Sequence, residues 1–258
     1  MSLDSKVLTI STLLFFSVYL GFVVGDFNFP PPVQKCRITD EKCMVEQANN
    51  FLRAYPHGYA ELGLPDLEPF LIDKLEILGD ANSAANINLY MTDLKFYNYS
   101  TLTFAKLRGF SKDTSKPLKI IAQSFIPTMT LKAKYKISGK VLVLPINGEG
   151  DLEWIITGTE VRSKMVFSPQ PRDGKTWLQI SEYKLLSKIK NVKINMTNLF
   201  NGDKALSENM LQVLNENSQV LSEEISPQID EAMTKKHRTF MEKWFESVPY
   251  EDYFLPEA

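Results

Sequence analysis

Two histidines are the first residues to consider for chemistry, because histidine is the commonest acid–base side chain near neutral pH and a frequent metal ligand. His57 and His237 lie far apart in the chain, and neither belongs to an HExxH pair that would hold zinc. We expect both at the surface or at helix ends. The sequence also contains no GxSxG nucleophile elbow and no glycine-rich phosphate or dinucleotide motif. These observations favour a protein that is not an enzyme and that needs no cofactor or metal.

Two cysteines offer a second kind of chemistry, the formation of a disulfide. Cys36 and Cys43 lie in the segment CRITDEKC, and no histidine lies near them to complete a zinc site. A bridge over so short a loop is worth about 2–3 kcal/mol in the chain-entropy account and ties down the N-terminal segment. We therefore expect these cysteines to be bridged, as in proteins that pass through an oxidising compartment.

The first 25 residues have the pattern of a secretory leader. Lys6 precedes an uncharged run over residues 7–25, and Val23 and Gly25 suit the small-residue positions before a cleavage site. The run is also long enough to cross a bilayer, so a retained anchor is the alternative. We predict a signal peptide over residues 1–25 and a secreted, extracellular single domain over residues 26–258.

Two short motifs agree with export. Asn98 in NYS and Asn195 in NMT are acceptors for N-glycosylation, a modification available to a secreted chain. Three-residue motifs arise often by chance, so these two support secretion only together with the leader.

Charge and size exclude one class of partner. The chain has 258 residues, with 29 Lys and Arg against 31 Asp and Glu, and a net charge of -2. Nucleic-acid-binding domains usually carry a strong basic excess, so we expect no nucleic-acid partner. The hydrophobic content of 44% is sufficient for a sizeable core.

The stretch LKAKYKISGKVLVLP, residues 131–145, carries a row of lysines on one side of a predicted strand. Successive side chains in a strand face opposite sides, so Lys132, Lys134, Lys136 and Lys140 point one way and an apolar row points the other. We interpret the lysine row as a solvated face. The alternative is a lysine face that docks transiently on an anionic membrane, as in a lipid-transfer protein.

The helices and strands of the chain can be predicted from the periodicity of its hydrophobic residues. A helical period predicts one helix over residues 40–55 and a very long one over 203–247, which Pro227 should kink or interrupt. The segments NGEG (147–150) and PRDGK (171–175) are predicted to be turns between strands. A period of two predicts strands over residues 71–79, 84–98, 101–110, 117–126, 129–144, 150–167, 175–190 and 191–197.

The predicted strands each have one apolar face, and the long helix has one apolar stripe. A single arrangement can bury all of these apolar surfaces against one another. It is an α+β domain in which a strongly curved antiparallel sheet wraps around the C-terminal helix. Such a wrap leaves volume between sheet and helix, which is either filled by side chains or open to an apolar ligand. Periodicity by itself favours the filled core and leaves the cavity as the alternative.

Several motifs, in the same order, resemble the insect takeout and juvenile-hormone-binding protein family. They are CRITDEKC, GLPDLEPF, YKISGKVLVLPINGEG, LFNGDKALSENMLQVLNENS with SPQID, and VPYEDYFLPE. The resemblance covers nearly the whole mature chain. It implies a secreted carrier whose curved antiparallel sheet encloses a hydrophobic tunnel around a long helix, a fold related to bactericidal permeability-increasing proteins. It also implies a disulfide between Cys36 and Cys43.

The resemblance further implies a small hydrophobic ligand, either a terpenoid such as juvenile hormone or a fatty acid, and we expect a monomer. With two cysteines the chain is closer to the takeout branch than to dedicated hormone carriers, so the hormone itself is not assigned. Tyr135 is the sharpest candidate for a ligand contact, because its ring could line a tunnel and its hydroxyl could bond a ligand oxygen. The candidates on the strands and the long helix, each with ordinary core packing as the alternative, are Tyr135, Ile137, Val141, Val143, Leu152, Trp154, Ile156, Met165, Phe167, Leu214, Leu221, Ile225 and Ile229.

Overall fold

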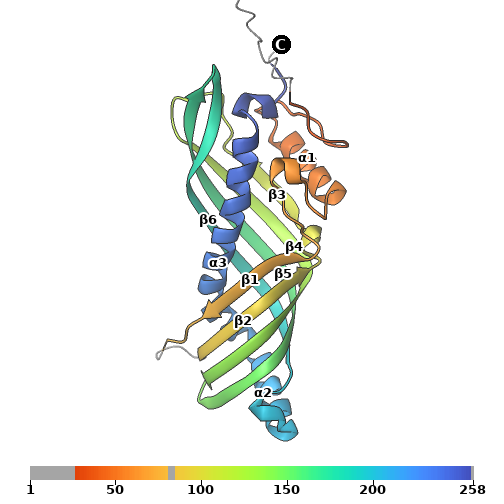
Figure 1. Ribbon diagram of the computed structural model, residues 1–258, viewed down its shortest axis with the longest axis vertical. Coiled ribbons are helices and arrows are strands. Elements are labelled where there is room, and N and C mark those ends of the chain that lie inside the picture. The colour runs from red at the N-terminus through yellow and green to blue at the C-terminus, as the bar shows by residue number, and fades with distance from the viewer. Residues whose placement is uncertain (1–26, 81–84, 257–258) are drawn as a thin grey trace, which may run out of the picture.

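A single curved antiparallel sheet forms most of the computed structural model, which describes residues 27–80 and 85–256 (Figure 1). The predicted leader, residues 1–25, lies outside this part. The strands are paired in the order β1-β2-β4-β5-β6, and β3 pairs with β4. Their bounds are β1 (Phe70–Ile77), β2 (Ala85–Tyr97), β3 (Thr103–Arg108), β4 (Leu118–Val141), β5 (Leu144–Arg172) and β6 (Lys175–Met196).

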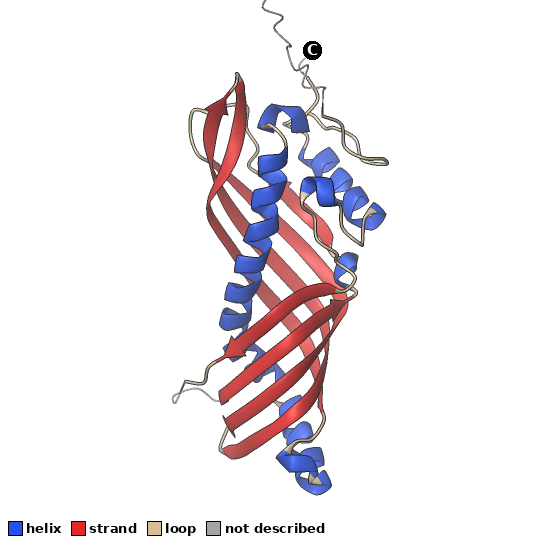
Figure 2. Ribbon diagram, viewed as in Figure 1, coloured by secondary structure: helices blue, strands red, loops and turns tan. Residues whose placement is uncertain are grey.

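The long C-terminal helix α3 (Ser218–Ser247) runs along the concave side of this sheet (Figure 2). In the lower half of the view the sheet curls around α3, and in the upper half α1 (Glu41–Ala54) covers the space beside it. The predicted α+β fold, a curved sheet around a long helix, is confirmed. The remaining helical segments are α2 (Lys204–Glu216) and the short 3₁₀ turns Ala60–Leu62, Tyr99–Thr101, Phe200–Gly202 and Tyr250–Tyr253.

The predicted interruption of the long helix at Pro227 is wrong. Pro227 lies inside α3, and the helix is interrupted instead at Asn217, between α2 and α3. Asn217 has φ -108° and ψ 12°, and its side-chain amide donates to the carbonyl of Val213. Just before it, both groups of the Asn215 side-chain amide pair with the backbone of Ile194 in β6. Because these polar contacts hold the end of α2 on the sheet, the chain changes direction here without a proline.

None of the described helices is long and apolar enough to cross a membrane.

The predicted turn at NGEG is also wrong, because these residues lie within β5. The turn is at Leu142 and Val143, since Val141 pairs with Leu144. Gly148 and Gly150 serve close packing instead. A Cβ atom on Gly148 would come within 2.9 Å of the Leu199 backbone, and the neighbouring strand end approaches Gly150 as closely. The predicted turn at PRDGK is confirmed, since Asp173 and Gly174 connect β5 to β6.

In β4, β5 and β6 the alternation of inward-facing and outward-facing side chains shifts by one residue. The three shifts lie on one line across the sheet. In β4 the buried positions are even-numbered up to Ile126 and odd-numbered from Met129 onward. In β5 the change falls at Gly158, which has φ +70°, and in β6 it falls between Ile189 and Val192. The strand pairing places these positions side by side. We call this line the crease. It explains why sequence periodicity divides β4 and β6 into two strands each, although both are continuous.

Candidate ligand-binding cavities

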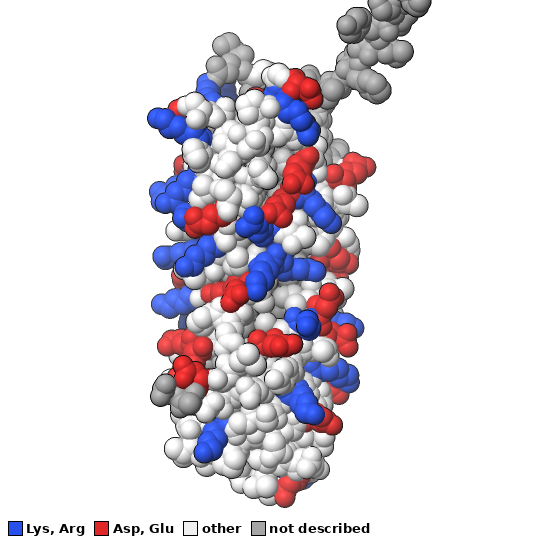
Figure 3. Space-filling model, turned by 60° about the vertical axis from the view of Figure 1, so that its left-hand side comes forward, with Lys and Arg blue, Asp and Glu red and all other residues white. Residues whose placement is uncertain are grey.

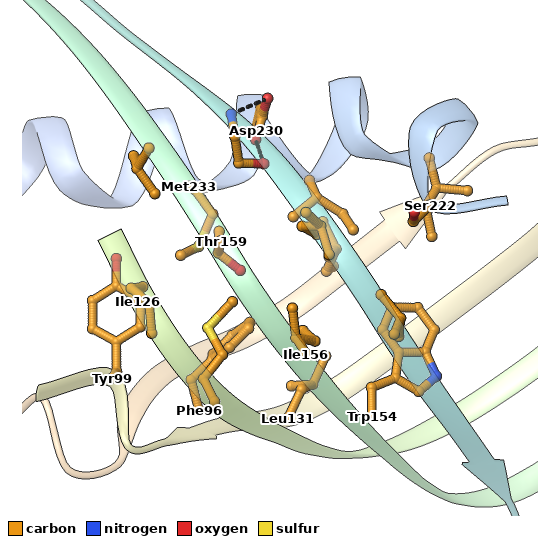
Figure 4. Close-up of a pocket in the computed structure, with 18 of the residues that line it drawn as sticks. Phe96, Tyr99, Ile126, Leu131, Trp154, Ile156, Thr159, Ser222, Asp230 and Met233 are labelled. Carbon is orange, nitrogen blue, oxygen red and sulfur yellow. Dashed lines mark hydrogen bonds between the residues drawn. The ribbon is translucent and has the colours of Figure 1, made fainter. Parts of the chain in front are cut away.

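Two apolar cavities lie between the sheet and α3, one in each half of the molecule. The lower cavity is walled by β1, β2, β4, β5, β6 and α3, and its volume is about 70 Å³ (Figure 4). The apolar side chains that face it include Phe96, Ile126, Ile156, Leu221 and Met233. The sheet encloses this space because its strands curl around the helix, so a ligand here would be shielded from water.

The upper cavity is larger, at about 270 Å³. Its walls are α1, β3, the first part of β4, parts of β5 and β6, the end of α3 and the segments before α1 and after α3. Aromatic rings such as Phe29, Phe51, Phe110, Trp244 and Phe254 face it. Ring contacts connect these segments, for example Phe51 against Trp244 with centroids 5.0 Å apart. The cavity is therefore formed by elements that are distant in sequence.

A buried polar pair lies where the two cavities meet. Tyr99 and Val161 line both cavities, and the Tyr99 hydroxyl lies 2.8 Å from Nε2 of His237. Burial lowers the pKa of His237 to about 4, so the ring is neutral near pH 7, and burial raises the pKa of Tyr99. The expectation that both histidines lie at the surface is wrong for His237, which is packed among Phe70, Tyr99 and Phe240. It holds for His57, which is 72% exposed.

One carboxyl group faces the lower cavity. Asp230 on α3 accepts a hydrogen bond from the Ser187 hydroxyl at 2.6 Å and one from the Ser187 backbone amide at 2.9 Å. Burial raises the pKa of Asp230, and these two bonds partly oppose the increase. Both oxygens of the Asp230 carboxyl group therefore accept hydrogen bonds that join α3 to the edge strand β6. Within the described residues, no group of three or more His, Cys, Asp or Glu could hold a metal ion.

Comparison with known proteins identifies the family. The family profile described as Haemolymph juvenile hormone binding protein (JHBP) matches residues 12–255. The chain belongs to this family. The resemblance to the takeout and juvenile-hormone-binding family is thereby confirmed, and the cavities of this JHBP-family chain lie within the matched region.

Relatives and a solved structure agree with the assignment to the JHBP family. The "Circadian clock-controlled protein daywake" of Drosophila yakuba is 34% identical over 233 residues, covering 89% of this chain and 90% of the relative. The protein of the same name from Drosophila melanogaster is 34% identical over 235 residues, with the same shares covered. The crystal structure of Takeout 1 from Epiphyas postvittana has a TM-score of 0.75 and 23% identity, covering 85% of this chain and 98% of that chain. At that identity, the likeness to Takeout 1 shows a common fold.

The structure brings five of the predicted contacts of this JHBP-family protein together around the lower cavity. Leu221, Ile225 and Ile229 face it from α3, and Trp154 and Ile156 face it from β5. The predicted residue Met165 lies on β5 too, but it lines the upper cavity.

The other predicted contacts line neither cavity. Tyr135 donates its hydroxyl to the carbonyl of Thr197 at 2.6 Å, so the proposed ligand hydrogen bond is already used within the protein. Val143 is wrong as a lining residue because it lies in the β4–β5 turn and is 83% exposed. Phe167 packs on Phe245 with ring centroids 4.5 Å apart. The remainder are ordinary core residues, namely Ile137, Val141, Leu152 and Leu214.

Sequence reasoning missed most of the upper cavity. Its lining comes from short aromatic segments before α1 and after α3, and from one face of α1. The signal available was the concentration of aromatic residues in FNFPPP and VPYEDYF. The disulfide prediction is confirmed: Cys36 and Cys43 are bridged, and the Cys36 carbonyl accepts from the amide of Leu255 at 2.9 Å. The bridge therefore lies where the segment before α1 meets the segment after α3 beside the upper cavity.

Three lysines of the row on β4 pair with carboxylates on β5. Lys132 lies 3.8 Å from Glu153, and Lys136 lies 3.5 Å from Glu149. Lys134 makes the closest pair, at 2.5 Å from Asp151. Figure 3 shows Lys and Arg interspersed with Asp and Glu over one face of this JHBP-family protein. Such a surface attracts anionic lipid weakly, which counts against the alternative of a membrane-docking lysine face.

Proposed function

We propose that this protein is a secreted, monomeric, non-enzymatic carrier of a small hydrophobic molecule, a terpenoid or another lipid. The observation that carries the proposal is the pair of apolar cavities between sheet and helix. They meet at Tyr99 and Val161, so a long ligand could extend from one into the other. Membership of a family named for hormone binding supports the same function.

Secretion and modification are part of the proposal. The leader pattern, the disulfide and the two acceptor motifs all fit a chain exported as residues 26–258. Asn98 and Asn195 are both exposed and hence accessible to glycosylation.

The test is saturable binding of a neutral fluorescent dye such as Nile red, and its displacement by a terpenoid alcohol such as farnesol. Ala122 is 5% exposed and lines the upper cavity, so Ala122→Trp should fill part of that space and weaken binding by about tenfold or more. Val143→Trp adds the same ring at the exposed turn and should bind as wild type does. Circular dichroism would establish that both variants are folded. Absence of saturable binding by the wild-type protein would overturn the carrier proposal.

A further inference from the structure

The boundary between the two cavities lies at nearly the same level on each element that lines both of them. These elements are β4, β5, β6 and α3. The residues nearest to the boundary are Ser124 and Ile126 on β4, Val161 on β5, Tyr183 and Leu185 on β6, and Met233 and His237 on α3. The strand register places Ser124 beside Val161. The side chains at this one level therefore decide whether the two cavities communicate.

A hydrogen bond crosses the space at this level. Tyr99 belongs to the 3₁₀ turn between β2 and β3, and its ring points toward α3 (Figure 4). Its hydroxyl lies 2.8 Å from Nε2 of His237 on α3, and both side chains are buried. The ring of Phe70 stacks on Tyr99 with centroids 4.7 Å apart and meets His237 edge-on at 5.7 Å. The pair therefore joins the turn to the helix across the passage between the cavities.

The turn that carries Tyr99 is held from outside both cavities. The Glu68 carboxylate accepts from the Asn98 backbone N–H at 2.7 Å and from the Ser100 hydroxyl at 2.9 Å. Asn98 has φ +61°, a left-handed conformation that the bond to Glu68 helps to hold. Glu68 itself lines neither cavity. Because one carboxylate holds both neighbours of Tyr99, the ring has little freedom to leave the passage.

A ligand that extends from one cavity into the other has to displace this pair. Displacement separates the Tyr99 hydroxyl from the His237 ring, and an apolar lipid chain cannot replace their hydrogen bond. A buried polar group without a partner costs free energy, so the affinity for such a ligand is reduced. A ligand whose chain ends within one cavity meets no such cost.

We propose that the hydrogen bond between Tyr99 and His237 is a partition that limits the length of the bound ligand, and that Glu68 positions it. This proposal rests on the carrier function and adds a determinant of its specificity.

The test measures displacement of Nile red by n-alkanols from octanol to hexadecanol, below their solubility limits. Each methylene group buried in an apolar cavity is worth about fourfold in affinity. The affinity of wild type should therefore rise with chain length and then level off, once the chain fills a single cavity. The readout is the ratio of hexadecanol affinity to octanol affinity, because a general loss of stability weakens the binding of both ligands alike.

Substitutions at Tyr99 should open the partition. Tyr99→Leu removes the hydroxyl and shortens the side chain, so it should raise the ratio by about tenfold or more. Tyr99→Phe keeps the ring and breaks the hydrogen bond, so it should raise the ratio several-fold. Tyr183→Phe is the matched control, since the Tyr183 hydroxyl lies 3.5 Å from Ser163 on β5 and does not reach α3. Its ratio should equal that of wild type, and circular dichroism would establish that each variant is folded.

A variant outside the cavities separates positioning from a change in the cavity wall. Glu68→Ala should raise the ratio several-fold, although Glu68 lines neither cavity. Glu61→Ala is its control, because Glu61 accepts from the Tyr59 hydroxyl and does not contact the turn. An unchanged ratio in folded Glu68→Ala would overturn the positioning role of Glu68.

Two results would overturn the partition and leave the carrier function intact. One is a wild-type affinity that keeps rising up to hexadecanol, and the other is an unchanged ratio in folded Tyr99→Leu and Tyr99→Phe. Failure of wild type to bind the dye or any alkanol would instead overturn the carrier function.

Discussion

Gln228 and Asp230, two residues apart on α3, bond to opposite edges of the same sheet. The Gln228 side-chain amide accepts from the backbone N–H of Leu78 at 2.9 Å, just beyond β1, and donates to its carbonyl at 3.1 Å. Asp230 accepts from the backbone N–H of Ser187 in β6 at 2.9 Å. Edge strands expose unpaired backbone groups that favour aggregation, so the polar face of α3 protects both edges of the sheet. The helix thereby joins the two edges and closes the wall around the lower cavity.

The first prediction follows from this closure. Gln228→Ala should lower the free energy of unfolding by about 1–2 kcal/mol, because it removes two hydrogen bonds to the edge of the sheet. Gln212→Ala is the control, since within the described part of the chain the Gln212 side chain bonds to Glu216 on the same helix, and the change should stay within about 0.5 kcal/mol. Urea denaturation measures both values. Faster amide hydrogen exchange at Leu78 in Gln228→Ala alone would locate the effect, and equal losses of stability in the two variants would contradict it.

The second prediction concerns the pH dependence of stability. Burial lowers the pKa of His237 to about 4, against an ordinary value of 6.5. In acid the unfolded chain therefore binds a proton on this residue that the folded protein does not. The stabilising contribution is fully present above pH 6.5 and is lost as the pH falls from 6.5 toward 4. Near pH 4.5 the loss should be about 2–3 kcal/mol.

His237→Gln removes this titration, so its free energy of unfolding should fall less steeply than that of wild type between pH 6.5 and 4.5. His57→Gln is the control at an exposed histidine and should follow the wild-type curve. Denaturant melts across this pH range provide the measurement. Parallel curves for wild type and His237→Gln would show that the ring is accessible to protons in the folded state.

The third prediction separates core from cavity. Ile137 is buried in the core and lines neither cavity, whereas Ile225 lines the lower cavity. Ile137→Ala should therefore lower the free energy of unfolding by about 2–5 kcal/mol and leave ligand affinity unchanged. Ile225→Trp should fill the lower cavity and weaken ligand binding by about tenfold or more. Dye displacement and thermal melts on the same samples test both statements, and unchanged displacement by folded Ile225→Trp would contradict the placement of the ligand.

The fourth prediction concerns export. Expression of the full chain in insect cells should give a secreted protein that begins near residue 26, and Asn98→Gln and Asn195→Gln should each remove the mass of one glycan. The side chains at both positions are exposed, so folding leaves them accessible. Intact mass spectrometry before and after enzymatic deglycosylation measures this. Retention of the protein in the membrane fraction would favour the alternative of an uncleaved anchor.

Several features follow from the sequence because their causes are local. The helix α1, the turn at Asp173 and Gly174, and the disulfide over a short loop depend on residues that are neighbours in the chain. The strands and the long helix could be predicted from periodicity, since each buries one face. That one curved sheet wraps around α3 follows from matching these apolar faces, and the family resemblance points to the same fold.

The tertiary structure decided which residues line a cavity, because that depends on strand register and on contacts between distant segments. Gly148 and Gly150 have the local signature of a turn, yet close approach by residues near Leu199 requires them inside β5. Tyr135 lies on the inward face of β4, but its hydroxyl already donates a hydrogen bond to the Thr197 carbonyl. Thr159 faces inward only because the phase of β5 shifts at Gly158, in line with shifts in β4 and β6. Local propensity cannot report such a shift, since it is the pairing of three strands around a helix that sets the direction of each side chain.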